Sequence, residues 1–410
     1  MITNSENFKF FLRQIPYRIK TALLEDLPKY KRTLKYLYKK YGLRRAYNFL
    51  WVKLFVKECG PAIINPLWSA FPEWAPYPTH IELEVTTKCH LKCAICEQRY
   101  WKETPQNISW DNFVRIINQF PNLKWIGLAG IGTNFCHPDF VKMLKFLKDR
   151  NIFVEFVDHL DLMTEEKTRA IVEMGVDRIW ISIDGAKKET YEGIKVGTSF
   201  ERMTDHLKTL IRIKKELNSP LPELFFRFVA TKQNIHEAPD FVDMIASLGK
   251  REDFGDGSYI EIAGLLYFNE ISDDYYLAEI PQTIKDEVLR RAKAAGITVA
   301  FSHSHPTRRR PRHFCAAWVE PFIFVTGEVN PCCAQNEANQ RELQRKNSLG
   351  NIFEKPFKEI WYSEKYKSFR RNMPDYSKPV PDYCKDCRVT NMNELPADRR
   401  CDYDDCIRET

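Results

Sequence analysis

The sequence predicts an α/β fold: a partial (β/α)6 barrel with a helical N-terminal extension and a small cysteine-rich C-terminal domain. Two observations predict the barrel. Six strand-like runs alternate with helical ones between residues 81 and 263, which is typical of parallel strands joined by crossover helices. The loop after the first strand contains cysteines and no Gly-x-Gly-x-x-Gly, so a dinucleotide-binding sheet is not indicated. A third observation, seven cysteines within residues 315–406, marks the C-terminal domain.

Composition places the chain among globular proteins. Its 410 residues, 44% of them hydrophobic, suffice for roughly two to three domains. Mean hydropathy is −0.45 and no uncharged apolar run is long enough to cross a bilayer, so no transmembrane span is expected. The first residues, MITNSENFKFF, lack the basic-then-apolar order of a signal peptide, and we expect a cytoplasmic protein. In a reducing compartment, clustered cysteines bind metal or perform redox chemistry more often than they form disulfides.

The N-terminal extension, residues 1–78, is basic. It holds fourteen Lys and Arg against five Asp and Glu, which is +9, whereas the whole chain is +7. Such a local excess indicates an anionic surface and not nucleic acid. Residues 1–58 show helical spacing, and a linker is then predicted by five prolines, Pro61, Pro66, Pro72, Pro76 and Pro78. Residues 44–57 combine cations with Trp and Phe, so they predict either an interfacial helix at a membrane surface or a helix packed on the barrel.

The predicted barrel spans residues 79–300. Its strands are expected at residues 81–85, 125–129, 152–157, 178–183, 224–230 and 259–263, and the helices between them at 110–119, 138–150, 165–174, 200–217 and 237–247. Because the strands are parallel, their carboxyl ends meet at one edge, where a barrel places its chemistry. Four polar residues near these ends are candidates without an assigned role: Asp158, His159, Arg227 and Glu261.

Three cysteines follow the first strand with the spacing C-x3-C-x2-C, namely Cys89, Cys93 and Cys96. A structural zinc site has four protein ligands, whereas an iron-sulfur cluster held by three cysteines keeps one iron open for another ligand. The position of the triad, on a loop at the carboxyl end of a strand, favours the second hypothesis. The alternative is a zinc site in which His90 or a distant group is the fourth ligand.

At these residues the chain resembles the radical SAM superfamily, and the resemblance covers about residues 80–265. It implies that the triad binds a [4Fe-4S] cluster whose fourth iron chelates S-adenosylmethionine (SAM). It also implies SAM contacts from six positions, Ile95, Gly130, Gly132, Thr133, Ser182 and Asp184. Thr133 stands where the family has a glutamate, and Val157-Asp158-His159 replaces the usual Thr-Asn-Gly. A hydroxyl lacks the charge that strengthens a hydrogen bond to the amino group of SAM, so a weaker hold on SAM is expected.

The cysteines of residues 301–410 resemble the SPASM domain of radical SAM enzymes, which holds auxiliary [4Fe-4S] clusters. The implied ligands are Cys315, Cys332, Cys333, Cys384, Cys387, Cys401 and Cys406. Seven thiols are one short of two fully ligated clusters, so one or two auxiliary clusters are expected. The alternative is a zinc ribbon formed by the last four of these cysteines. Cys59 and Cys136 have no partner by spacing and are expected to be buried.

The resemblance also implies a function. A radical SAM enzyme cleaves SAM reductively to a 5′-deoxyadenosyl radical, which abstracts hydrogen from an unactivated C–H bond. An external one-electron donor such as ferredoxin or flavodoxin is then expected. The basic, aromatic-rich N-terminal extension favours a membrane-lipid alkyl chain as the substrate, with peripheral contact at the membrane surface. The alternatives are a SPASM-type maturase that modifies a peptide or protein side chain, and a non-enzymatic zinc-binding interaction module.

Overall fold

The computed structural model describes most of the barrel and parts of both flanking regions. The described residues are 20, 24, 27–57, 74–265, 270–271, 273–302, 310–311, 320–333, 341–373, 377–381, 384 and 390–391. Several predictions therefore lie outside the described residues: the helices before residue 27 for the most part, the prolines up to Pro72, and the cysteines Cys59, Cys315, Cys387, Cys401 and Cys406.

The centre of the fold is a sheet whose strands run in the order β11-β10-β9-β1-β2-β3-β4-β5-β6-β7. Neighbouring strands from β1 to β7 are all parallel, so their carboxyl ends lie at the same edge. These strands are β1 (His80–Leu83), β2 (Trp125–Leu128), β3 (Phe153–Asp158), β4 (Arg178–Ser182), β5 (Glu223–Ala230), β6 (Ile260–Gly264) and β7 (Val299–Ser302). The partial barrel is confirmed, with β7 as a parallel strand beyond the six expected ones.

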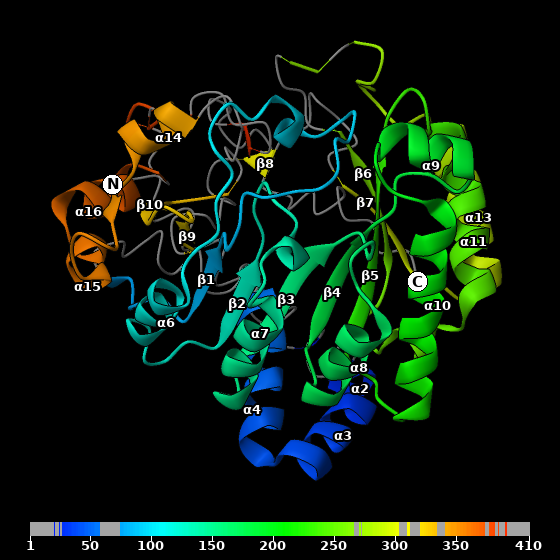
Figure 1. Ribbon diagram of the computed structural model, residues 1–410, viewed down its shortest axis with the longest axis horizontal. Coiled ribbons are helices and arrows are strands. Elements are labelled where there is room, and N and C mark those ends of the chain that lie inside the picture. Colours follow the sequence, from blue (N-terminus) through cyan, green and yellow to red (C-terminus); the bar gives the residue numbers. More distant parts are fainter. Residues whose placement is uncertain are drawn as a thin grey trace.

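Crossover helices connect the strands and cover one face of the sheet (Figure 1). They are α6 (Trp110–Asn118), α7 (Phe140–Asp149), α8 (Glu165–Met174), α9 (Lys188–Ile194), α10 (Phe200–Glu216), α11 (Ala238–Leu248), α12 (Arg251–Phe254) and α13 (Gln282–Ala295). Side chains cap three of them: the hydroxyls of Ser109, Thr164 and Ser199 accept hydrogen bonds from the first turns of α6, α8 and α10. Local chemistry thus fixes where these helices begin.

The two faces of the parallel strands differ in chemistry. Alternate residues, such as Ile179 and Ile181 of β4, belong to the hydrophobic core beneath the helices. The residues between them, such as Trp180 and Ser182, point to the opposite face, because successive side chains of a strand alternate. On β5 and β6 this opposite face carries Arg227, bonded to the carboxylate of Glu261 at 2.6 Å. The interior of the barrel is therefore polar in part.

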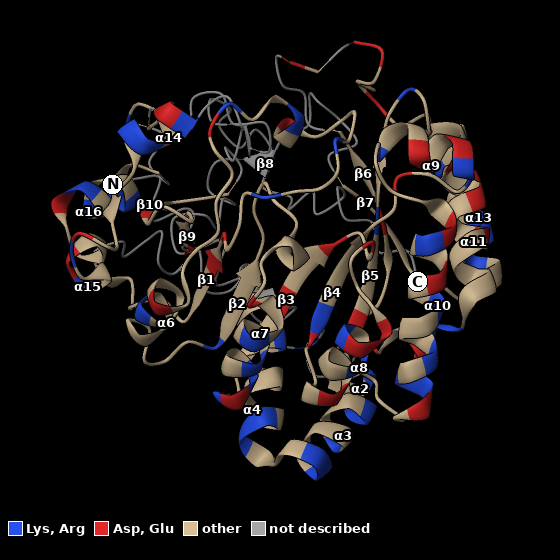
Figure 2. Ribbon diagram, viewed as in Figure 1, with Lys and Arg blue, Asp and Glu red and all other residues tan. Residues whose placement is uncertain are grey.

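The N-terminal helices close the barrel at the amino ends of its strands. They are α2 (Leu27–Lys29), α3 (Lys31–Tyr41), α4 (Leu43–Val52) and the π-helical turn η2 (Lys53–Lys57). Basic residues line α3 and α4 below the sheet (Figure 2). Phe49 packs on Phe153 of β3, and the fully buried Lys53 pairs with Glu223 at 2.5 Å. Of the two hypotheses for residues 44–57, the structure shows the packed helix; none of the described helices is long and apolar enough to cross a bilayer.

C-terminal segments extend the sheet on the side of β1. They are β9 (Phe322–Ile323), β10 (Glu328–Asn330), α14 (Arg341–Asn347), β11 (Gly350–Asn351), α15 (Phe357–Trp361) and α16 (Glu364–Asn372); β8 (Arg310–Pro311) pairs separately with β12 (Thr390–Asn391). Strand β9 is parallel to β1, and β10 is antiparallel to both β9 and β11. The domain boundary near residue 300 stays a prediction, and hydrogen bonds of the sheet cross it.

Candidate active site

The predicted cluster loop, residues 84–109, leaves the carboxyl end of β1 and carries the three cysteines of the triad. Backbone hydrogen bonds hold it in place: Lys92 donates to Val196 at 2.9 Å and Ala94 to Ile194 at 2.7 Å. The loop is therefore joined to the segment that follows α9. The Cys96 sulfur begins the short helix η4 (Glu97–Tyr100) by accepting a hydrogen bond from the backbone of Gln98.

The three thiols of the triad lie close enough to influence one another. Burial raises the pKa of Cys96 to about 12, and the neighbouring Cys93 and Cys89 add to that rise. Burial likewise raises the pKa of Cys93. Three soft sulfur donors of this kind suit iron or zinc, and coordination to a metal removes their protons. Among the described residues, no group of three His, Cys, Asp or Glu side chains converges on one point as the ligands of a single ion do.

The glycine segment after β2 brings backbone against the cluster loop. A Cβ on Gly132 would lie 2.5 Å from the carbonyl oxygen of Thr86 and 2.7 Å from that of Lys88, so no side chain fits there. A Cβ on Gly130 would lie 2.5 Å from the Cγ of Glu84. The next residue, Thr133, donates its backbone N–H to the carbonyl of Lys88 at 2.8 Å. Only glycine fits at both positions, because atoms of Glu84, Thr86 and Lys88 lie where a Cβ would be.

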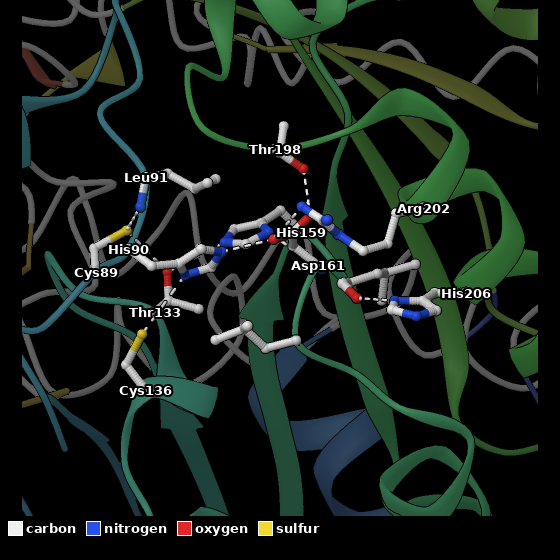
Figure 3. A network of polar contacts seen from close by, with 12 residues as sticks. Cys89, His90, Leu91, Thr133, Cys136, His159, Asp161, Thr198, Arg202 and His206 are labelled. Carbon is white, nitrogen blue, oxygen red and sulfur yellow. Dashed lines mark hydrogen bonds and ion pairs between the residues drawn. The ribbon is translucent and has the colours of Figure 1, made fainter.

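Thr133 joins the cluster loop to the end of β3. Its hydroxyl oxygen lies 3.1 Å from the sulfur of Cys89 and 3.2 Å from Nε2 of His159 (Figure 3). Burial lowers the pKa of His159 to about 3, so its imidazole is neutral at physiological pH. Burial raises the pKa of the neighbouring Asp158 to about 7. The structure thus brings Thr133 and His159 to the triad.

A second polar network, centred on Asp161, also contacts the cluster loop. The imidazole of His90 lies 2.8 Å from the carboxylate of Asp161, which also accepts hydrogen bonds from Thr198 at 2.5 Å and Arg202 at 2.9 Å (Figure 3). The sulfur of Cys136 lies 3.7 Å from His90. The expectation that Cys136 is buried is wrong, because it is half-exposed and flanks the cluster loop.

A buried cation, Lys195, contacts the end of β4 from the segment after α9, and the sequence does not predict this position. Lys195 lies 2.8 Å from the carboxylate of Asp184 and donates to the hydroxyl of Ser182 at 3.0 Å. Burial alone would lower the pKa of Lys195, but the charges of Asp184 and Cys93 raise it above its ordinary range. Lys195 therefore stays positive beside the triad. In the sequence it follows a helix like any surface lysine, and only the pairing of loops places it here.

Ile95 lies in a small apolar cluster at the edge of the loop. It packs with Ile194 and Ile271, and Tyr100 and Tyr275 flank the group. Such a surface suits one face of a flat, uncharged ring. The site thus has a charged part around Lys195 and an apolar part around Ile95.

Two family models match the chain. One, the radical SAM superfamily, matches residues 83–245, and the other, the SPASM iron-sulfur cluster-binding domain, matches residues 315–388. The chain is a radical SAM enzyme with a SPASM domain. SAM and [4Fe-4S] clusters, including auxiliary clusters, are thus its cofactors. This assignment contradicts the hypothesis of a non-enzymatic zinc-binding interaction module.

Curated relatives of this radical SAM enzyme share about a quarter of its residues. A tungsten-containing aldehyde ferredoxin oxidoreductase cofactor-modifying protein of Pyrococcus furiosus is 26% identical, covering 76% of this chain and 87% of the relative. A PqqA peptide cyclase of Bradyrhizobium diazoefficiens is 22% identical, covering 77% and 80%. An AdoMet-dependent heme synthase of Nitratidesulfovibrio vulgaris is 24% identical, covering 76% and 88%.

Among solved structures, Streptococcus suis SuiB bound to SAM has the same fold. It superimposes with a TM-score of 0.57 at 15% identity, covering 94% of this chain and 87% of SuiB. The structure of SuiB bound to its precursor peptide SuiA gives the same TM-score of 0.57 at 14% identity, covering 87% and 85%. At this identity the likeness concerns the fold alone.

The expected auxiliary-cluster ligands are described only in part. Cys332 and Cys333 follow β10, and Cys333 contacts both Cys332 and Glu82 of β1. Cys384 is buried in the hydrophobic core. These contacts place two SPASM thiols beside the first strand of the barrel. The ligand sets of the auxiliary clusters stay a prediction.

Proposed function

We propose that this radical SAM enzyme modifies a side chain of a peptide or protein. The observation that supports the proposal is the similarity to PqqA peptide cyclase, which covers 77% of this chain. None of the relatives described above is named for a lipid. The comparisons therefore lend no support to the membrane-lipid substrate that the N-terminal extension favours, and the peptide alternative takes its place.

The inner wall of the barrel supports a polar substrate. Arg227 bonds Glu261 at 2.6 Å, and Ser302 donates to the same carboxylate at 2.7 Å. The guanidinium of Arg227 lies 4.5 Å from the ring centre of Trp180, and about a third of its side chain is accessible. Charged groups with an aromatic face can hydrogen-bond the amide groups of a peptide, whereas an alkyl chain would remove solvent from them and offer no hydrogen bond in return.

The residues around the triad fit the cofactors. We propose that Cys89, Cys93 and Cys96 hold the cluster. At Gly130 and Gly132, the absence of a side chain would let the protein backbone approach SAM. Lys195 supplies a positive charge that matches a carboxylate, and Ile95 supplies an apolar surface that matches adenine. When bound, the cofactors supply a 5′-deoxyadenosyl radical, which removes one hydrogen atom from the substrate.

Substrate positioning is the task of the chain itself. We propose that one substrate side chain lies between the triad and the Arg227–Glu261 pair, held against the reactive carbon, because a radical reacts with whatever hydrogen lies nearest. An external one-electron donor, ferredoxin or flavodoxin, belongs to the same proposal. A second candidate is modification of a cofactor, favoured by the relative from Pyrococcus furiosus.

The test uses the reconstituted enzyme under anaerobic conditions with SAM and dithionite. Three fractions of the source cells are added separately: peptides below about 10 kDa, small molecules, and extracted lipids. We expect peptides to increase 5′-deoxyadenosine formation and to contain a species that has lost two hydrogen atoms. Stimulation by lipids or small molecules alone would reject the proposal, and a Cys89→Ala, Cys93→Ala, Cys96→Ala variant is the control for SAM cleavage.

A further inference from the structure

Three groups form a continuous hydrogen-bonded chain that ends on a cysteine of the triad. Nε2 of His159 lies 3.2 Å from the hydroxyl oxygen of Thr133, which lies 3.1 Å from the sulfur of Cys89 (Figure 3). Thr133 is 6% exposed and His159 8% exposed, so water does not compete for these contacts. The hydroxyl has no capping role in the helical turn that follows it. The Thr133 hydroxyl is therefore directed at the sulfur, and His159 at the hydroxyl.

The direction of each hydrogen bond follows from the neighbouring groups. The backbone N–H of Asp161 lies 3.4 Å from Nδ1 of His159, so Nδ1 accepts and the proton of the neutral ring is on Nε2. Nε2–H then donates to the oxygen of Thr133. A cysteine that ligates iron has no proton and can only accept, so the Thr133 hydroxyl donates to Cys89.

We propose that Thr133, with His159 as a positioning residue behind it, raises the reduction potential of the SAM-binding cluster by a hydrogen bond to the Cys89 sulfur. The reduced cluster carries one more negative charge, and a donor at its sulfur stabilises that charge. His159 fixes the hydroxyl and polarises it in the same direction. The inference rests on the radical SAM assignment and does not depend on the peptide substrate.

The proposal accounts for the residue type at position 133. The glutamate that the family resemblance leads one to expect there is an acceptor when ionised, so it has no proton to donate to a thiolate. A hydroxyl donates to the sulfur and still has a lone pair for a donor on the ligand. Cys89 also accepts from the backbone N–H of Leu91 at 3.4 Å, a contact that no side-chain substitution removes.

The test is the midpoint potential of the reconstituted holoenzyme, without any substrate. Potentials are set with dithionite and followed by electron paramagnetic resonance, and the cluster is identified as the one whose signal changes when SAM is added. Thr133→Val keeps the shape but removes the donor. We expect a roughly tenfold shift of the one-electron equilibrium toward the oxidised cluster, which is about 59 mV more negative. Thr133→Ser should keep the potential, and His159→Phe should lower it by less than Thr133→Val.

A second readout follows the proton itself. Electron-nuclear double resonance should show a proton coupling to the cluster that disappears in deuterated buffer, in the wild type and in Thr133→Ser. Thr133→Val should lack this coupling and keep only the one from the Leu91 N–H. The matched control is His206→Gln, because His206 donates to the carbonyl of Leu160 at 2.8 Å and touches neither the triad nor Thr133. Its potential should equal that of the wild type.

Two results would overturn the proposal. One is an unchanged potential and proton signal in Thr133→Val at equal iron content. The other is a shift in Thr133→Ser as large as that in Thr133→Val. If Thr133→Val binds no iron, His159→Phe decides, because it keeps the hydroxyl: an unchanged potential in that variant rejects the relay. All these readings hold whether or not a peptide turns out to be the substrate.

Discussion

Lys195 and Asp184 form an ion pair that is almost completely removed from solvent. Their side chains are 7% and 3% exposed, and the nitrogen lies 2.8 Å from the carboxylate. Replacing Lys195 with Met would leave the Asp184 charge buried beside the Cys93 thiol. We expect the free energy of unfolding of the apoprotein to fall by about 3 kcal/mol, measured by urea denaturation.

The matched control for this variant is another lysine pair. Lys188 lies 2.8 Å from Glu201, and both side chains are more than half exposed. Because solvent screens such a pair, Lys188→Ala should lower the free energy of unfolding far less than Lys195→Met does. Equal losses in the two variants would show that the Lys195 pair is solvated in solution.

Asp158 predicts a dependence of stability on pH. Burial raises its pKa from 3.8 to about 7, so the folded chain binds this proton more tightly than the unfolded chain does. The stabilisation is complete below about pH 4 and is lost as pH rises to about 7, and it amounts to roughly 4 kcal/mol. Asp158→Asn has no proton to lose. Relative to the wild type, the variant should gain stability between pH 5 and 8 in thermal unfolding of the apoprotein; parallel curves would contradict this.

At the scale of single residues, spacing predicts the triad, and the family resemblance predicts further positions such as Thr133 and Asp184, but the contacts between these side chains cannot be predicted. Spacing alone identifies Cys89, Cys93 and Cys96, because all three lie on one loop. Lys195 and His159 reach the triad from other loops, and their distances from it depend on how the sheet places β3 and β4 relative to β1. Thr133 illustrates the limit: its sequence position is predicted, but its contact with Cys89 is visible only in the structure.

Among the elements, the connection between β1 and α14 joins the barrel to the SPASM region. Glu84, fully buried just after β1, accepts hydrogen bonds from Arg341 at 3.0 Å and from the backbone N–H of Ile131 and Val325 at 3.2 and 3.3 Å. The Glu84 carboxylate thus forms hydrogen bonds with the glycine segment, the β9–β10 turn and α14.

Glu84→Gln removes the charge and keeps the size of this side chain. Burial opposes ionisation of Glu84 and raises its pKa, while Arg341 favours the charged form. We expect faster hydrogen exchange in α14 and β10 of the variant, with unchanged exchange in β5 and β6, measured by mass spectrometry on peptic fragments. Arg345→Ala, which breaks a half-exposed pair with Glu103, should leave α14 nearly unchanged. Uniformly faster exchange across the barrel would contradict a local role.

Helices and strands are predicted correctly where the alternation of apolar and polar residues extends over enough positions. The helices between β1 and β6 and all six expected strands are present close to their predicted bounds, because each has a buried face with a regular repeat. Strands β9, β10 and β11 have only two or three residues each. So few positions show no alternation, and these strands are defined by their pairing: β9 with the edge of β1, β10 with β9, and β11 with β10.

On the scale of the whole molecule, the radical SAM region and the SPASM region share one sheet, so each contributes to the stability of the other. Leu83 of β1 pairs with Ile323 of β9, so the C-terminal region covers the edge of the first barrel strand. A chain ending at residue 302 would expose the backbone groups and apolar side chains of β1. We expect it to aggregate, as judged by size-exclusion chromatography, because open edges pair with other chains. A monomeric truncated chain that still binds SAM would show that residues 301–410 form an independent unit.

The pairing of β1 with β9 also has a consequence for biosynthesis. Leu83 and Ile323 are 240 positions apart, so at about 5–20 residues per second the ribosome needs roughly 12–48 s after making one before it reaches the other. During that interval the edge of β1 that faces away from β2 has no strand to pair with. A chaperone that shields exposed strands cotranslationally would act within this window, and synonymous codons that slow translation before residue 323 would lengthen it.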